Sequence, residues 1–138
     1  WAADHPLVRR VFDRRTSEAD VRGRSIAVAV DLDAAEARGW PRWRAVHAGE
    51  SCAFWLVRSG CWAMCPAAAM HRMEAAGHAV SAAARSAWVR RAVEACDAVC
   101  VPYLPVNEES ESVGEAVRWM VARNRPVFVD LVGGRHEG

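Results

Sequence analysis

The 138-residue chain contains no lysine, and all 18 of its basic residues are arginine. A phosphate-binding loop of the Walker type needs a lysine to reach the phosphates, so this class of nucleotide site is excluded. The glycine pattern GxGxxG, which cradles a dinucleotide pyrophosphate, is also absent from the sequence. We therefore expect neither a nucleoside triphosphate nor a dinucleotide cofactor, and no metal ion or other organic cofactor.

The sequence also lacks a strong charge of one sign and a long hydrophobic run. Its formal net charge is +1, and arginines and acids are interspersed, so no basic stripe is available to follow a nucleic-acid backbone. No apolar run reaches the roughly 18 residues that span a bilayer, and the N-terminal part lacks the apolar segment of a secretory signal. These features predict a soluble, cytoplasmic protein that binds neither nucleic acid nor membranes.

The sequence lacks the even, regularly spaced set of cysteines of a disulfide framework, since its five cysteines stand at positions 52, 61, 65, 96 and 100. Small secreted domains that rely on disulfides tend to carry an even number of regularly spaced cysteines. Here the cysteines are scattered through segments predicted to form the core. We expect reduced and mostly buried thiols.

From residue 53 onward, short apolar runs alternate with segments of helical periodicity. Pro66 suits the first position of a helix, and Gly77 suits the residue that follows its end. The predicted strands are residues 53–57, 78–81, 97–101 and 126–131, and the predicted helices are residues 67–76, 85–96 and 113–124. Such alternation indicates an α/β fold, namely a Rossmann-like (flavodoxin-like) three-layer sandwich with a mostly parallel sheet of four or five strands.

The N-terminal third of the chain has a weaker pattern. Its predicted elements are a helix at residues 7–15, a strand at residues 25–32 that pairs at an edge of the sheet, and an irregular connection at residues 34–47.

We therefore expect a single domain over residues 1–138, in which an N-terminal extension with an edge strand (residues 1–52) precedes a βαβαβαβ core (residues 53–132). The sequence begins with Trp1 and not with methionine, so we expect it to be processed or part of a longer chain.

Four features of the second half occur together in one known family. They are Cys96-Asp97 at the start of a strand, an acidic and serine-containing loop that begins with Leu104-Pro105, a glutamate on the next helix, and Arg125-Pro126-Val127 before the last strand. Over residues 67–131, about half of the chain, the sequence resembles the small uncharacterised relatives of nucleoside 2-deoxyribosyltransferases.

The resemblance implies chemistry at the N-glycosidic bond of a small-molecule nucleoside or nucleotide. In this chemistry a helix glutamate attacks the anomeric carbon and forms a glycosyl-enzyme. Counted back from Pro126, the glutamate of the family falls on Ala116, and this chain places Glu115 one residue earlier. Such a shift rotates a side chain by about 100° around the helix. We predict Glu115 as the nucleophile and Glu109 as the acid/base.

The residues predicted to contact the substrate lie in two loops of the predicted core. They are Ser59 and Gly60, after the first predicted strand, and Tyr103, Asn107 and Ser110, after the third. The second loop follows the carboxyl end of its strand, where open α/β sheets bind ligands.

Several alternatives remain open from the sequence. Ser112 and Glu115 have the spacing of a capping box, in which Glu115 would only stabilise the start of its own helix. The protein would then be a catalytically inactive module that binds a nucleotide-like ligand or a protein. His47 and Glu50, followed by two cysteines, faintly resemble the motif of a zinc deaminase, but their spacing departs from it. Trp119 lies off the apolar stripe of its helix, which indicates a contact in a homo-oligomer.

Overall fold

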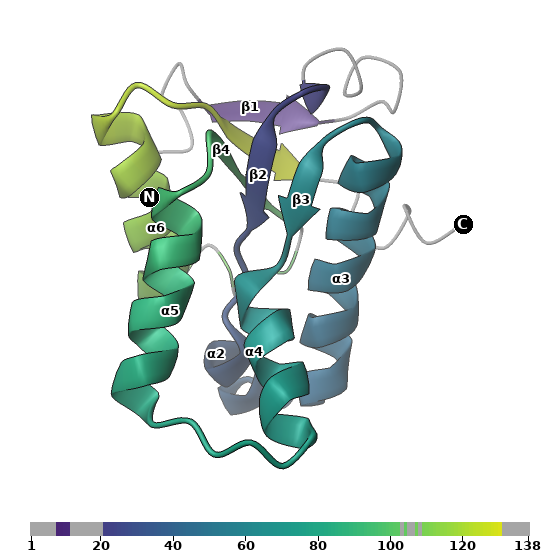
Figure 1. The fold of residues 1–138 in the computed structure, drawn as a ribbon, viewed down its shortest axis with the longest axis vertical. Coiled ribbons are helices and arrows are strands. Elements are labelled where there is room, and N and C mark those ends of the chain that lie inside the picture. The colour runs from purple at the N-terminus through teal and green to yellow at the C-terminus, as the bar shows by residue number, and fades with distance from the viewer. Residues whose placement is uncertain (1–7, 12–20, 103, 105–106, 108, 131–138) are drawn as a thin grey trace.

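The computed structural model describes residues 8–11, 21–102, 104, 107 and 109–130, and its centre is a five-stranded sheet (Figure 1). The strands are β1 (Val8–Val11), β2 (Ser25–Val28), β3 (Trp62–Met64), β4 (Ala98–Val101) and β5 (Val127–Asp130). Their order across the sheet is β1-β5-β4-β2-β3, and each neighbouring pair is parallel. The chain therefore has the predicted α/β, Rossmann-like architecture.

Helices cover both faces of this sheet (Figure 1). They are α2 (Leu32–Ala37), α3 (Arg42–Arg58), α4 (Pro66–Ala75), α5 (Ala82–Glu94) and α6 (Glu111–Ala122). Because side chains alternate along a strand, Ile26 and Val28 pack with α3 in one core cluster, whereas Ala27 packs with α5 and α6 in the other. This alternation produces the three layers.

The path of the chain creates a switch point between β2 and β4. From β2 the chain passes through α3 to β3 on one side, and it then returns through α5 to β4 on the other side of β2. The loops after β2 and β4 therefore diverge at the carboxyl edge of the sheet. Doubly wound sheets bind their ligands in the crevice at such a point.

The predicted strand at residues 53–57 is wrong, because this segment lies inside the 17-residue helix α3. Leu56 is fully buried, but Phe54 and Val57 are 61% and 51% exposed. An apolar run this short cannot be assigned to a strand or a helix by periodicity alone. The irregular connection predicted at residues 34–47 is also wrong, since α2 and the first third of α3 occupy most of it.

The edge position predicted for the strand at residues 25–32 is wrong as well. In the structure β2 pairs with β3 on one side and β4 on the other, so it lies inside the sheet. The described residues of this N-terminal part therefore supply an inner strand of the core. The described part of the predicted N-terminal helix, Val8–Val11, is strand β1, and the rest of that segment lies outside the described residues.

The remaining predictions agree with the structure with one exception, residues 78–81, which lie in the turn between α4 and α5 and form no strand. Pro66 occupies the first turn of α4, and Gly77 has a positive φ of 96° just after its end, as predicted. The five cysteines are free and four of them are buried, which agrees with the prediction of buried thiols. Among the described residues, no helix is long and apolar enough to cross a membrane.

Candidate functional site

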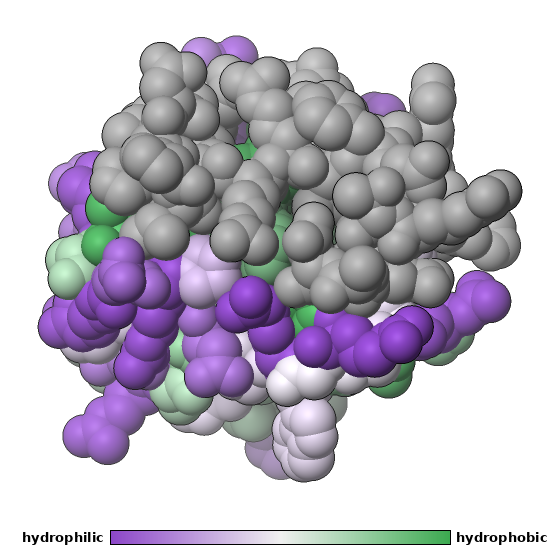
Figure 2. Space-filling model, turned by 90° about the horizontal axis from the view of Figure 1, so that it is seen from above, coloured by the Kyte–Doolittle hydropathy of each residue, from purple (hydrophilic) through white to green (hydrophobic). Residues whose placement is uncertain are grey.

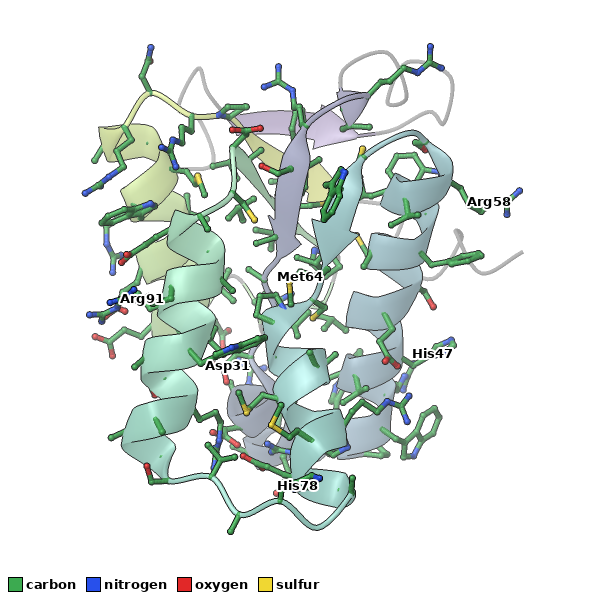
Figure 3. The ribbon with its side chains drawn as sticks, in the orientation of Figure 1. Asp31, His47, Arg58, Met64, His78 and Arg91 are labelled. Carbon is green, nitrogen blue, oxygen red and sulfur yellow. The ribbon has the colours of Figure 1, made fainter. Side chains whose placement is uncertain are left out.

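A cleft of about 910 Å³ opens at the carboxyl edge of the sheet. The loop after β2 and residues of α4, α5 and α6 form its walls. Figure 3 shows Asp31 in the lower half of the molecule, in the region between α5 and α4. The cleft therefore lies beside the switch point that the topology creates.

Asp31 connects the end of β2 to the start of α6. As the N-cap of α2, it accepts a hydrogen bond at Oδ1 from the backbone N–H of Ala34, at 2.9 Å. Its Oδ2 accepts hydrogen bonds from the hydroxyls of Ser110, at 2.5 Å, and Ser112, at 3.2 Å. Both oxygens of this carboxylate are thus occupied, which fixes the loop after β2 against α6.

Glu115 lies in the second turn of α6 and lines the cleft. The predicted capping box of Ser112 and Glu115 is wrong, because Ser110 is the N-cap and accepts the backbone N–H of Val113 at 3.1 Å. Glu115 and Ala116 both line the cleft, so the one-residue shift in the sequence leaves Glu115 within it. The Glu115 side chain is 53% exposed, and one of its oxygens lies 3.7 Å from a guanidinium nitrogen of Arg90.

Most of the arginines in the cleft are paired with acids. Arg42 lies 2.8 Å from Asp33 and 3.6 Å from Glu36. Partial burial opposes the charge of Arg42, but the bonds and attraction from these two acids outweigh it and raise its pKa. Arg85 binds Glu74 at 2.8 Å and joins α5 to α4. These pairs build a charged wall whose members hold one another in position.

His71 on α4 lies beside this wall. The Nε–H of Arg42 donates to Nδ1 of His71 at 3.4 Å. When Nδ1 accepts a hydrogen bond, the proton of the neutral imidazole sits on Nε2. His71 therefore offers one hydrogen-bond donor, its Nε2–H, beside the cleft.

Three of the other predicted site residues do not line the cleft. Glu109 forms an ion pair with Arg38, just after α2. Asn107 is 1% exposed, and its Nδ2 donates to the carbonyl of Pro102 at 3.0 Å, so it stabilises the loop after β4. Ser110 is the N-cap of α6 and lies behind two residues that line the cleft, Asp31 and Ser112, with which its hydroxyl forms hydrogen bonds.

Ser59, Gly60 and Tyr103 complete the predicted set. Tyr103 lies outside the described residues. Ser59 and Gly60 follow α3 and precede β3, at the amino edge of the sheet, where the carbonyl of Gly60 accepts the N–H of Gly23 at 2.9 Å. Figure 2 views this edge from above, and Figure 3 shows the neighbouring Arg58 far from Asp31. The placement was wrong because the strand predicted before these residues is part of a helix.

The two remaining alternatives concern a zinc centre at His47 and Glu50 and an oligomer contact at Trp119. No group of three or more metal-binding side chains lies together in the part of the chain that the structure describes, so His47 and Glu50 do not form a zinc centre. Trp119 is only partly exposed; its ring lies against the guanidinium of Arg123, and its indole Nε1 is buried at the cleft. The contact of Trp119 in a homo-oligomer stays a prediction.

Sequence reasoning missed two key residues of the cleft, Asp31 and His71. Asp31 comes directly after the apolar run of residues 26–30, and an acid at the end of a buried parallel strand is a recognisable signal. That signal was overlooked because the strand was placed at an edge. His71 carries no comparable signal, since only the packing of α4 beside α3 and α5 brings it to the cleft.

The chain was compared with protein-family models, with curated proteins and with solved structures, and none of the three comparisons found a match.

Proposed function

We propose that the cleft binds a nucleoside or nucleotide and that Glu115 attacks its N-glycosidic bond, as in a deoxyribosyltransferase-like enzyme or an N-glycosidase. The observation that carries this proposal is the position of Glu115, a carboxylate that lines a cleft at the switch point of a doubly wound sheet. The sequence resemblance over residues 67–131 supports the same chemistry.

In the proposed reaction, the carboxylate of Glu115 attacks the anomeric carbon of the sugar. The bond from that carbon to the base nitrogen breaks, and its electron pair leaves with the base. Water or a second base then attacks the same carbon, which releases Glu115 and regenerates the enzyme.

The departing base needs a proton. Glu109, predicted from the sequence as the acid/base, pairs with Arg38 and does not line the cleft. The Nε2–H of neutral His71, whose Nδ1 is occupied by Arg42, would donate a hydrogen bond to the departing base, and the proton itself would come from water. The exposed hydroxyl of Ser112, held beside Asp31, is a suitable partner for a hydroxyl of the sugar.

The test is to incubate the protein with deoxynucleosides, ribonucleosides and their monophosphates and to follow the free base by chromatography. We expect the wild type to release base and Glu115→Gln to release none above background. Glu109→Gln is the matched control, because it makes the same chemical change at a residue that does not line the cleft and loses only a surface ion pair with Arg38.

A second candidate function is an inactive module that binds the same ligands. It is favoured by Ala116, which lines the cleft at the position that the resemblance gives to the nucleophile, and by the pairing of Glu115 with Arg90. Saturable binding of a nucleoside, measured by calorimetry, without release of base would support this module and refute the enzyme. Equal activity of Glu115→Gln and Glu109→Gln would refute Glu115 as nucleophile.

A further inference from the structure

Two buried thiols from distant parts of the chain meet in the core between α3 and the sheet. Cys52 lies on the inner face of α3 and is 2% exposed, and Cys100 lies in β4 and is 1% exposed. Their sulfur atoms are 3.5 Å apart, although the residues are separated by 48 positions in the sequence. A disulfide requires a sulfur–sulfur distance of about 2.05 Å, so the two atoms need to approach by roughly 1.5 Å.

The other three cysteines have different surroundings. The thiol of Cys61 donates to the carbonyl of Val21 at 3.1 Å, and that of Cys96 donates to the carbonyl of Ala92 at 3.3 Å. Cys65 lies at the start of α4 and packs against Gly49. Cys52 and Cys100 are distinguished by the direct contact of their two sulfur atoms.

We propose that Cys52 and Cys100 form a latent disulfide, which a small neutral hydroperoxide closes as a redox-sensitive staple between α3 and β4. In the first step, one thiol sulfur attacks the peroxide; the O–O bond breaks, giving a sulfenic acid and releasing water or an alcohol. In the second step, the other sulfur attacks the sulfenic acid, an S–S bond forms, and a second water leaves. The thiols are oxidised by two electrons and the hydroperoxide is reduced by two.

Burial determines which oxidant can act and how fast. A bulky disulfide reagent cannot reach either sulfur in the folded protein, whereas hydrogen peroxide is close to water in size. The first step is therefore slow and the second is fast, because the second thiol is already in contact with the first.

The staple would act on the stability of the fold. It would join a helix of one layer to a central strand across 48 residues, and closing a long loop reduces the conformational freedom of the unfolded chain. The carbonyl of Cys100 also accepts the N–H of Ala29 at 2.9 Å, next to the loop that carries Asp31, so the staple would reinforce the strand pair beside the cleft.

The experiment treats the folded protein with hydrogen peroxide, removes the oxidant and alkylates all remaining thiols in denaturant. We expect the disulfide to protect two of the five thiols, so that three remain open to alkylation. Trypsin cleaves after arginine, so the expected cross-link joins residues 45–58, which contain Cys52, to residues 92–118, which contain Cys96 and Cys100. The thermal midpoint of the oxidised protein should rise by several degrees and return after reduction.

Two variants assign the bond. Cys96→Ser should keep the cross-link and Cys100→Ala should lose it. If neither variant folds, the peptide map of the oxidised wild type still tests the proposal. Oxidation of Met73, which is 44% exposed, shows that the oxidant was effective. The proposal is overturned if Met73 is oxidised while all five thiols remain, if the cross-link joins other cysteines, or if the oxidised protein unfolds at a lower temperature.

Discussion

Replacing Gly49 by alanine tests how closely α3 packs against the start of α4. Gly49 lies in the middle of α3 on its buried side. An added Cβ would lie 2.6 Å from the sulfur of Cys65 and 3.4 Å from its Cβ. Contacts below 3.0 Å are essentially never seen for a real Cβ, so a neighbouring group has to move.

Two opposing effects determine the size of the change. Alanine is favoured over glycine inside a helix by about 1 kcal/mol. The overlap with Cys65 costs roughly 1–3 kcal/mol, typical of an overpacked core, because this side chain is 5% exposed and has little room to retreat. The variant Gly114→Ala is the matched control: its Cβ would meet only the tip of the Arg118 side chain, at 3.2 Å, which can swing away.

The assay is urea unfolding followed by circular dichroism. Both variants gain the same preference of alanine over glycine in a helix. The free energy of unfolding should therefore be lower for Gly49→Ala than for Gly114→Ala by roughly 1–3 kcal/mol. Adding Cys65→Ala to Gly49→Ala should recover most of this difference after correction for Cys65→Ala alone. Equal stability of the two glycine variants would refute the close packing of α3 against α4.

Three further predictions concern the cap, the pH response and the thiols. Ser110→Ala should reduce the free energy of unfolding by about 0.5–2 kcal/mol in urea titrations, because it removes the N-cap of α6 and a hydrogen bond to Asp31; an unchanged value would refute the cap. The N–H of Ser25 donates to Asp97 at 3.2 Å, which with the Ser25 side chain lowers the pKa of this carboxyl. Because the pKa is lower in the folded protein, the ionised carboxylate of Asp97 stabilises the fold at pH values above its ordinary pKa near 4. This stabilisation is lost as the pH falls through the pKa of the folded protein. Asp97→Asn should therefore flatten the loss of stability in urea titrations at acid pH. A thiol reagent should label Cys96 first in the folded protein, since the other four cysteines are buried, and early labelling of any of those four would contradict the structure.

The second half of the fold could be predicted from the sequence because its signals are local. Pro66 and Gly77 mark the ends of α4, and the apolar run that became β4 is fully buried on both faces. The first half could not be assigned in this way. The apolar residues 53–57 satisfy the pattern of a buried strand, and only the register of α3 against the sheet shows that Phe54 and Val57 face outward.

The candidate site was predictable only in part. Glu115 was found because it lies in a segment with a family resemblance, and it does line the cleft. Its supposed partner Glu109 is close in the sequence but pairs with Arg38. Asp31 and His71 lie 40 positions apart and 44 or more from Glu115, so no local pattern connects them, and the packing of α4, α5 and α6 around the end of β2 brings them to one cleft.

The sequence by itself determined the class of fold, the boundaries of most elements after residue 60 and the burial of the thiols, because these depend on periodicity, on proline and glycine, and on the cost of exposing apolar groups to water. The tertiary structure decided which strand lies at the centre of the sheet and which edge carries the cleft. Those outcomes depend on the order in which parallel strands pair, and pairing is a contact between residues far apart in the chain, which no single segment encodes.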